Sequence, residues 1–131
     1  MVRKPASGLT EAEERIMRVL WDRGEASVRE VTDALDAKVA YNTVLTLLGI
    51  LKDKGVVTHR KDGRAFIYRA VLSEEAAQTK AVDRLVQALF KGAPDALAAH
   101  LIKTADLDRD SLDALRRELD SKADDMAGKA E

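Results

Sequence analysis

The residues whose types and spacing suggest a chemistry are polar or basic, and they lie in two short segments. In the first segment, Asn42, Thr43 and Thr46 carry amide and hydroxyl groups that can hydrogen-bond to the edges of DNA bases. The second segment surrounds an Asp-Gly pair and is basic, with Arg60, Lys61 and Arg64. Side chains of this kind contact phosphates, which position a protein on DNA without reading its sequence. The two segments therefore predict recognition of nucleic acid rather than catalysis.

Charge is unevenly distributed along the chain. The 131 residues have a formal net charge of −1, but residues 38–72 contain seven Lys and Arg against two Asp, a local charge of +5. The other residues must then carry −6. A basic segment in such a chain is typical of a nucleic-acid contact, while a solvated face with charges scattered by chance is the ordinary alternative.

The composition excludes several other classes of function. There is no cysteine, which excludes a disulfide scaffold, a thiol nucleophile and a cysteine-ligated metal. The two histidines, His59 and His100, fall in different predicted elements, and no set of catalytic residues can be assembled. The carboxylates at 106, 108 and 110 have calcium-loop spacing but lack the loop's glycine and glutamate, so Asp108 is interpreted as a helix cap. We therefore expect a protein that is not an enzyme and that needs no metal or small-molecule cofactor.

The length and composition are those of an ordinary soluble protein. Hydrophobic residues make up 46% and charged residues 34%, which suits one domain or a small domain with an appendage. No apolar run approaches the roughly 20 residues of a membrane span, and the basic start of the chain is not followed by a signal-peptide core. A cytoplasmic location is therefore expected.

Two capping boxes predict where the first two helices begin. Thr10 pairs with Glu13, and Ser27 pairs with Glu30, each a hydroxyl residue followed three positions later by a glutamate. Apolar residues follow each box at helical spacing, and Gly24 ends the first run. The link between the two helices is short, so they must be close neighbours.

A third helix and a hairpin follow. The helix is predicted from Tyr41 to Lys54 and is apolar over more than half of its circumference. Residues 56–60 and 65–69 are β-prone, and the Asp-Gly pair within the turn at 61–64 is typical of a hairpin. Three helices followed by a hairpin form the element order of a winged helix-turn-helix. In that fold the third helix enters the major groove of DNA, and the hairpin, or wing, lies along the DNA backbone.

This interpretation assigns residues 9–72 to a winged-helix DNA-binding domain that follows a disordered N-terminus, residues 1–8. Double-stranded operator DNA is the expected partner. The DNA contacts are predicted to come from the start of the third helix and the tip of the wing: Ala40, Tyr41, Asn42, Thr43, Leu45, Thr46, Arg60, Lys61 and Arg64.

Residues 73–120 are predicted to form a helical dimerisation region, followed by a polar tail at residues 121–131 that frays. The apolar stripes of this region are narrow and suit packing against a second copy, although folding back on the N-terminal domain is the alternative. A two-fold dimer would present its third helices to half-sites about 34 Å apart. The predicted dimer contacts are Val82, Leu85, Leu89, Phe90, Leu97, Leu101, Leu112, Leu115 and Leu119. The expected fold class is mainly α with a small β-hairpin.

Several short motifs occur in an order that is specific for one family. They are LTEAE at 9–13, VLW at 19–21, SVREV at 27–31, AYNTVLT at 40–46, LKDKG at 51–55 and DGRAFIY at 62–68. With these motifs the chain resembles the BlaI/MecI/CopY family of transcriptional repressors, of the penicillinase-repressor type. The resemblance implies a homodimeric winged-helix repressor that binds a palindromic operator. In the penicillinase branch it also implies a membrane-bound sensor metalloprotease, which triggers cleavage in the dimerisation region so that the second half-site's contribution is lost.

The family's residues transfer only in part to this chain. Its recognition-helix threonines correspond to Thr43 and Thr46. Where some members have a lysine and the penicillinase repressors have an arginine, this chain has Asn42 and Leu45, which removes a bidentate guanine contact and predicts a different operator. The scissile pair of those repressors falls on His100–Leu101. The cysteine metal site of the copper-responsive branch is excluded, because the chain has no cysteine.

A second hypothesis comes from the apolar character of the third helix. Leu45, Leu48 and Ile50 are unusual on a surface that reads a DNA groove. The alternative function is therefore a winged-helix protein-interaction module that binds no DNA. This alternative predicts that the protein shows no salt-sensitive binding to DNA.

Overall fold

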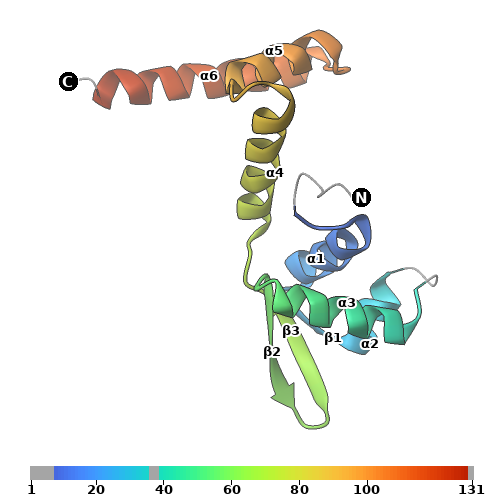
Figure 1. Cartoon of the computed structure of the whole chain (residues 1–131). Coiled ribbons are helices and arrows are strands. Elements are labelled where there is room, and N and C mark those ends of the chain that lie inside the picture. Colours follow the sequence, from blue (N-terminus) through green and yellow to red (C-terminus); the bar gives the residue numbers. More distant parts are fainter. Residues whose placement is uncertain (1–7, 36–38, 130–131) are drawn as a thin grey trace. The chain divides into compact units, whose positions relative to one another are not determined.

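The computed structural model describes residues 8–35 and 39–129 of the chain (Figure 1). Its elements are, in order, α1 Glu11–Arg23, β1 Glu25–Ser27, α2 Val28–Ala34, α3 Tyr41–Asp53, β2 Val57–Asp62, β3 Ala65–Ala70, α4 Glu74–Leu89, α5 Pro94–Thr104 and α6 Arg109–Lys129. The chain divides into two compact units, Met1–Lys91 and Gly92–Glu131. The predicted disordered N-terminus lies outside the described residues except for Gly8. The fold is mainly helical with a small antiparallel sheet, as predicted.

Both predicted capping boxes are present and set the starts of α1 and α2. Thr10 Oγ1 accepts a hydrogen bond from the Glu13 N–H at 3.2 Å, and Glu13 Oε1 accepts one from the Thr10 N–H at 2.9 Å. Ser27 and Glu30 repeat the arrangement at 3.1 and 2.9 Å. Gly24 ends α1 with a φ of 84°, a conformation that glycine adopts without steric cost. These local predictions are confirmed.

The core of the first unit lies between the helices α1, α2 and α3 and the sheet. Buried apolar side chains from all of these elements, and from the segment before α1, form one cluster: Leu9, Ile16, Met17, Leu20, Ala26, Val28, Val31, Val44, Leu48, Leu51, Val57 and Tyr68. The cluster fixes the rotation of α3, because its residues Val44, Leu48 and Leu51 are fully buried. The opposite side of α3 is therefore held toward solvent.

The sheet has a third strand that the sequence analysis missed. Its order is β1-β3-β2, with both neighbouring pairs antiparallel. We interpreted the segment around Ala26 only as a link between two helices, but Ala26 is opposite Tyr68 on β3 and is buried. Three residues are too few to show the alternation by which a strand is recognised in a sequence.

The wing consists of β2 and β3 and has a tighter turn than predicted. Asp62 is opposite Ala65, so only Gly63 and Arg64 form the turn, while Lys61 and Asp62 belong to β2. Gly63 has a φ of 64°, and among the described residues Lys91 alone combines a side chain with a positive φ. Glycine with positive φ at the first turn position is typical of a type II′ turn, whose twist matches that of paired strands.

The C-terminal helices begin at the predicted residues. Ser73 caps α4 by accepting from the Ala76 N–H at 3.1 Å, and Asp108 caps α6 by accepting from the Ser111 N–H at 2.8 Å. The Ser111 hydrogen bonds hold the pKa of Asp108 below its usual value. The predicted fraying from Ser121 is wrong, because α6 continues to Lys129. None of the helices described is both long and apolar enough to cross a membrane.

Candidate nucleic-acid interface

The solvent-facing side of α3 presents the residues predicted to read bases. Because the core holds one face of the helix, the residues on the other face are exposed, and Asn42, Thr43 and Thr46 are among them. Tyr41 and Leu45 flank them and are 40% and 42% exposed. Ala40, which precedes the helix as its N-cap residue, is also exposed but makes no side-chain cap. The structure therefore brings Ala40 and the five predicted residues of α3 to one end of the helix and to solvent.

The exposed residues in the first turns of α3 carry no charge, whereas Lys52 and Asp53 in its last turn are exposed and charged. There is no lysine, arginine or acidic residue between Tyr41 and Leu51. The Thr46 hydroxyl donates a hydrogen bond to the Asn42 carbonyl oxygen at 3.0 Å, so its hydrogen is used within the helix. What Thr46 offers outward is a methyl group and an oxygen that accepts hydrogen bonds. A face of this kind can contact base edges but not neutralise phosphates.

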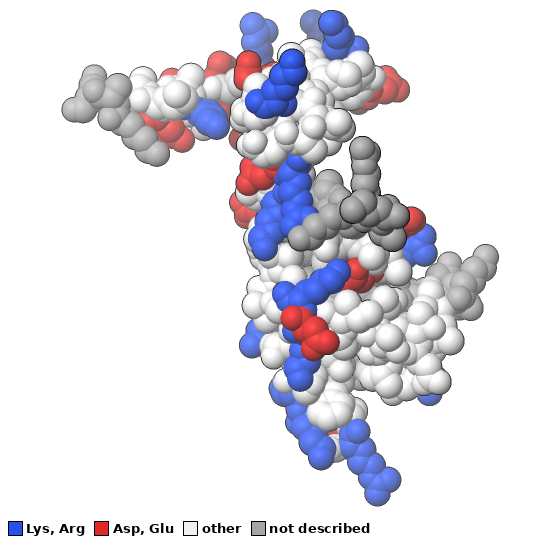
Figure 2. Space-filling view, in the orientation of Figure 1, with Lys and Arg blue, Asp and Glu red and all other residues white. Residues whose placement is uncertain are grey.

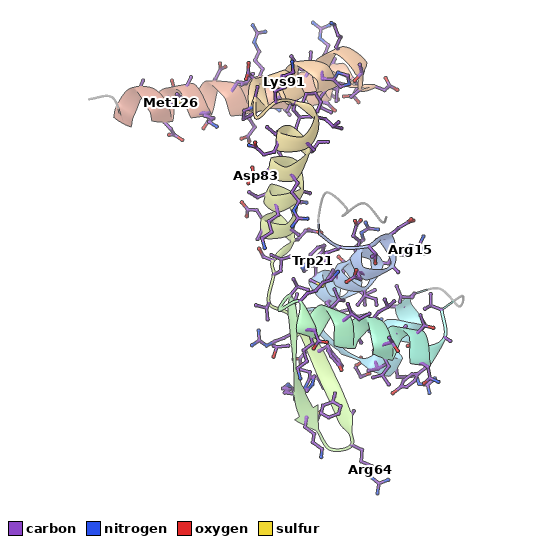
Figure 3. All side chains as sticks on the ribbon, in the orientation of Figure 1. Arg15, Trp21, Arg64, Asp83, Lys91 and Met126 are labelled. Atoms are coloured by element: carbon purple, nitrogen blue, oxygen red, sulfur yellow. The ribbon has the colours of Figure 1, made fainter. Side chains whose placement is uncertain are left out.

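The wing supplies positive charge that the first turns of α3 lack. Lys61 and Arg64 are exposed at its end, and neither forms an ion pair within the described parts of the chain. Figure 2 shows blue basic side chains at the tip of the hairpin, and Figure 3 shows Arg64 extending away from it. Both cations are therefore available to phosphate groups.

Arg60 is placed differently from the other two wing cations. Its Nη2 lies 2.9 Å from Glu25 Oε1 on β1, and this neighbouring carboxylate raises the pKa of Arg60 above its usual value. The pair is half exposed and joins the outer strands β1 and β2 across β3. Arg60 is thus partly neutralised by the protein itself, which the sequence analysis did not foresee.

An aromatic cluster lies along one face of the wing. The His59 ring is 4.6 Å from the Phe66 ring and 5.1 Å from the Tyr68 ring, measured between centroids. Tyr68 is buried in the core, whereas Phe66 is 43% exposed and lies opposite Lys61 in the strand pairing. The rings extend from the core toward the basic tip of the wing. In the sequence, the alternating pattern of residues 65–69 was the signal that could have placed Phe66 and Tyr68 on the same face of the strand.

Arg29 on α2 is a further cation that the sequence analysis missed. Its guanidinium carbon lies 5.1 Å from the centre of the Tyr41 ring, a distance suited to a cation–π interaction. Both residues are exposed. The contact adds a positive charge beside the N-terminal end of α3, where no charged residue of α3 itself is found.

Two long-range contacts hold α3 and the wing against α1. The Lys54 ammonium, just after α3, lies 2.7 Å from Glu13 Oε2 and 2.9 Å from Oε1. The Trp21 indole N–H donates to the Leu72 carbonyl oxygen, just after the wing, at 2.9 Å. Trp21 is labelled in Figure 3 beside α1. The two parts of the candidate interface are thereby fixed to one scaffold helix.

The predicted dimer contacts lie on α4, α5, α6 and the residue that follows α4. Leu97 is buried, and Leu85 and Phe90 are half-buried. The other six are exposed by between 42% and 73% of their surface: Val82, Leu89, Leu101, Leu112, Leu115 and Leu119. The predicted scissile pair, His100–Leu101, is exposed but lies inside α5, and the Thr104 hydroxyl donates to the His100 carbonyl oxygen at 2.7 Å.

Comparisons with known proteins agree with this geometry. A model of the penicillinase repressor family matches residues 9–121. The chain is 37% identical to the transcriptional regulator BlaI of Mycobacterium tuberculosis over 115 residues, which cover 85% of this chain and 82% of that protein. It is 24% identical to the methicillin resistance regulatory protein MecI of Staphylococcus aureus over 116 residues, 87% of this chain and 94% of that protein.

The fold is also found among solved structures. A mutant of MarR from E. coli, complexed with operator DNA, superposes with a TM-score of 0.51 at 17% identity, covering 86% of this chain and 74% of MarR. At that identity the likeness concerns the winged-helix fold alone. The family match extends over both compact units of the chain. The chain therefore belongs to the penicillinase repressor family, and it is a DNA-binding winged-helix transcriptional repressor.

Proposed function

We propose that the chain is a homodimeric repressor that binds a palindromic operator, with α3 in the major groove and the wing along the DNA backbone. One observation carries this proposal: the exposed first turns of α3 carry polar side chains and no charge, and they adjoin a wing whose two terminal cations have no ion-pair partner within the described chain. The first feature suits base edges and the second suits phosphates.

The two elements divide the work of recognition. Asn42, Thr43 and Thr46 contact base edges and determine which sequence is bound. Lys61 and Arg64 contact phosphates and contribute affinity for every sequence. Arg60 contributes less than these two, because Glu25 already compensates its charge at 2.9 Å. Arg29, stacked on Tyr41, adds a phosphate contact at the opposite end of the helix face from the wing.

The first experiment is a selection of random duplex DNA on the full chain at moderate salt. We expect enrichment of a palindrome whose half-sites are about one helical turn, roughly 34 Å, apart. Enrichment of a single, unrepeated site would contradict the dimeric arrangement. If a folded sample enriches no sequence, operator recognition is wrong, and the alternative of a protein-interaction module replaces it.

Variants of the two elements separate their roles. Arg64→Ala should weaken binding to all duplexes alike and reduce the slope of log affinity against log salt by about 0.9, one phosphate contact. Thr46→Ala should instead relax the preference for the selected operator over random DNA while leaving the salt slope unchanged. Lys103→Ala removes an exposed lysine of α5 and is the matched control, for which neither quantity should change. If Arg64→Ala relaxed the preference for the operator as much as Thr46→Ala does, the assignment of base reading to α3 and phosphate contact to the wing would be overturned.

Release of the repressor by proteolysis stays a prediction. A sensor metalloprotease that led to cleavage at His100–Leu101 would need α5 to unwind locally, because the bond lies within a regular helix. Cleavage there would separate α6 from the DNA-binding unit and with it the exposed leucines Leu112, Leu115 and Leu119. The two half-sites would then no longer be bound as one unit.

A further inference from the structure

The exposed face of α3 contains a leucine among its polar residues. Leu45 is 42% exposed and lies between the exposed threonines Thr43 and Thr46 in the sequence. A single exposed leucine on a protein surface is ordinary. At this position, however, it shares the helix face that we place in the major groove, so it needs a chemical role there.

The part of the face around Leu45 carries no charge. The Thr46 hydroxyl hydrogen is directed to the Asn42 carbonyl oxygen at 3.0 Å, so Thr46 offers no hydroxyl donor to a base. No charged residue lies between Tyr41 and Leu51, so the turns of α3 around Leu45 have no lysine or arginine for the paired acceptors of guanine. In the major groove, the only apolar group that a base pair presents is the C5-methyl group of thymine.

We propose that Leu45 reads thymine through contact with its C5-methyl group. The inference rests on the proposed function, in which α3 lies in the major groove. It makes Leu45 a residue that determines specificity by apolar contact. Each operator half-site then contains at least one thymine that this leucine covers.

The test uses the operator obtained by the selection described above. Each thymine of a half-site is replaced in turn by deoxyuridine, which keeps every hydrogen-bonding group and removes only the methyl group. At the position that Leu45 covers, binding of the full chain should weaken about fourfold per half-site, the equivalent of about 0.8 kcal/mol per buried methyl group. With both half-sites replaced, the loss should be about 15-fold.

Two variants assign the methyl contact to a residue. In Leu45→Ala, which removes an exposed side chain from a helix that alanine favours, the fold should be retained and the deoxyuridine effect at that position should disappear. Val71→Ala removes an apolar side chain that is 56% exposed outside α3, and its deoxyuridine effect should equal that of the parent. Thermal melting by circular dichroism verifies that both variants fold.

The outcomes distinguish this inference from the proposed function. If the operator is enriched but deoxyuridine at every position binds as tightly as thymine, the methyl contact is wrong and operator recognition stands. If the deoxyuridine effect persists unchanged in Leu45→Ala, the contact belongs to another residue and the inference is overturned. If no operator is enriched at all, it is the proposed function that fails.

Discussion

At the scale of the residue, Glu13 combines two tasks in one buried carboxylate. Its side chain is 2% exposed, yet it accepts hydrogen bonds from the Thr10 N–H and from the Lys54 ammonium. Burial by itself raises the pKa of Glu13, but the hydrogen bonds from Lys54 and Thr10 lower it further than burial raises it. The group is therefore charged in the folded protein, and it connects the start of α1 to the end of α3.

Glu13→Gln should lower the free energy of unfolding at pH 7 by about 1–3 kcal/mol, because a partly buried ammonium loses its ionised partner. The pKa of Glu13 is lower in the folded chain than in the unfolded chain, where it is near 4.5. The ionised carboxylate therefore stabilises the fold fully above the unfolded-state pKa, and this stabilisation is lost as the pH falls through the folded-state pKa. The difference between parent and variant should therefore shrink below about pH 4.5. Urea unfolding at pH values from 7 to 3 measures it.

Glu11→Gln is the control in the same helical turn. Glu11 pairs with Arg15 at 3.0 Å, but the two side chains are 82% and 58% exposed. Exposed pairs contribute little, so this change should cost less than about 0.5 kcal/mol at every pH. A cost for Glu11→Gln as large as that for Glu13→Gln would show that burial is not the cause.

At the scale of the element, the wing turn requires its glycine for backbone conformation, whereas the helix α3 does not require the glycine that it contains. Gly63 has a φ of 64° in the wing turn, a conformation that residues with a Cβ atom rarely adopt. Gly49 lies inside α3, where a Cβ would meet no atom within 4 Å and helical geometry suits any residue. The turn needs its glycine, whereas the helix does not.

The two alanine substitutions should therefore change stability in opposite directions. Gly63→Ala should lower the free energy of unfolding by about 1–2 kcal/mol, through strain in the turn. Gly49→Ala should raise it by about 0.5–1 kcal/mol, since alanine loses less conformational entropy in a helix. Urea unfolding midpoints of the two variants and the parent test this. A gain in stability from Gly63→Ala would contradict the assigned turn.

At the scale of the whole molecule, the C-terminal unit exposes apolar side chains on α6 that a monomer would leave in water. Leu112, Leu119 and Met126 recur every seven residues and are 42%, 65% and 62% exposed, and Leu115 lies between the first two. Figure 3 labels Met126 toward the C-terminal end of the helix. A seven-residue repeat of this kind is typical of a helix that packs against another helix. It supports the proposal that a second copy covers α6.

Leu119→Glu should convert the dimer to a monomer at micromolar concentration, because a charge would be buried at the centre of the repeat. Light scattering after size-exclusion chromatography measures the mass. Leu45→Glu is the control, since it places the same charge at a leucine that is 42% exposed but lies on α3, and its mass should equal that of the parent dimer. A monomeric parent would overturn the dimer, and a dimeric Leu119→Glu would exclude this part of α6 from the interface.

The sequence by itself determined those features that depend on residues a few positions apart. Both capping boxes, the glycine after α1, the Asp108 cap and the hairpin are set by hydrogen bonds and backbone preferences within about four residues. Their signals are therefore visible without a fold. The order of the elements and the position of the wing tip followed from these local signals.

Only the tertiary structure decided what depends on partners far along the chain. Arg60 meets Glu25 across 35 residues, Lys54 meets Glu13 across 41, and β1 becomes a strand only because β3 is available to pair with it. The side of α3 that faces solvent was equally undetermined, since apolar residues surround most of that helix and the core selects three of them. Which cations remain available to DNA is a consequence of this packing, because an ion pair forms only where the fold brings opposite charges together.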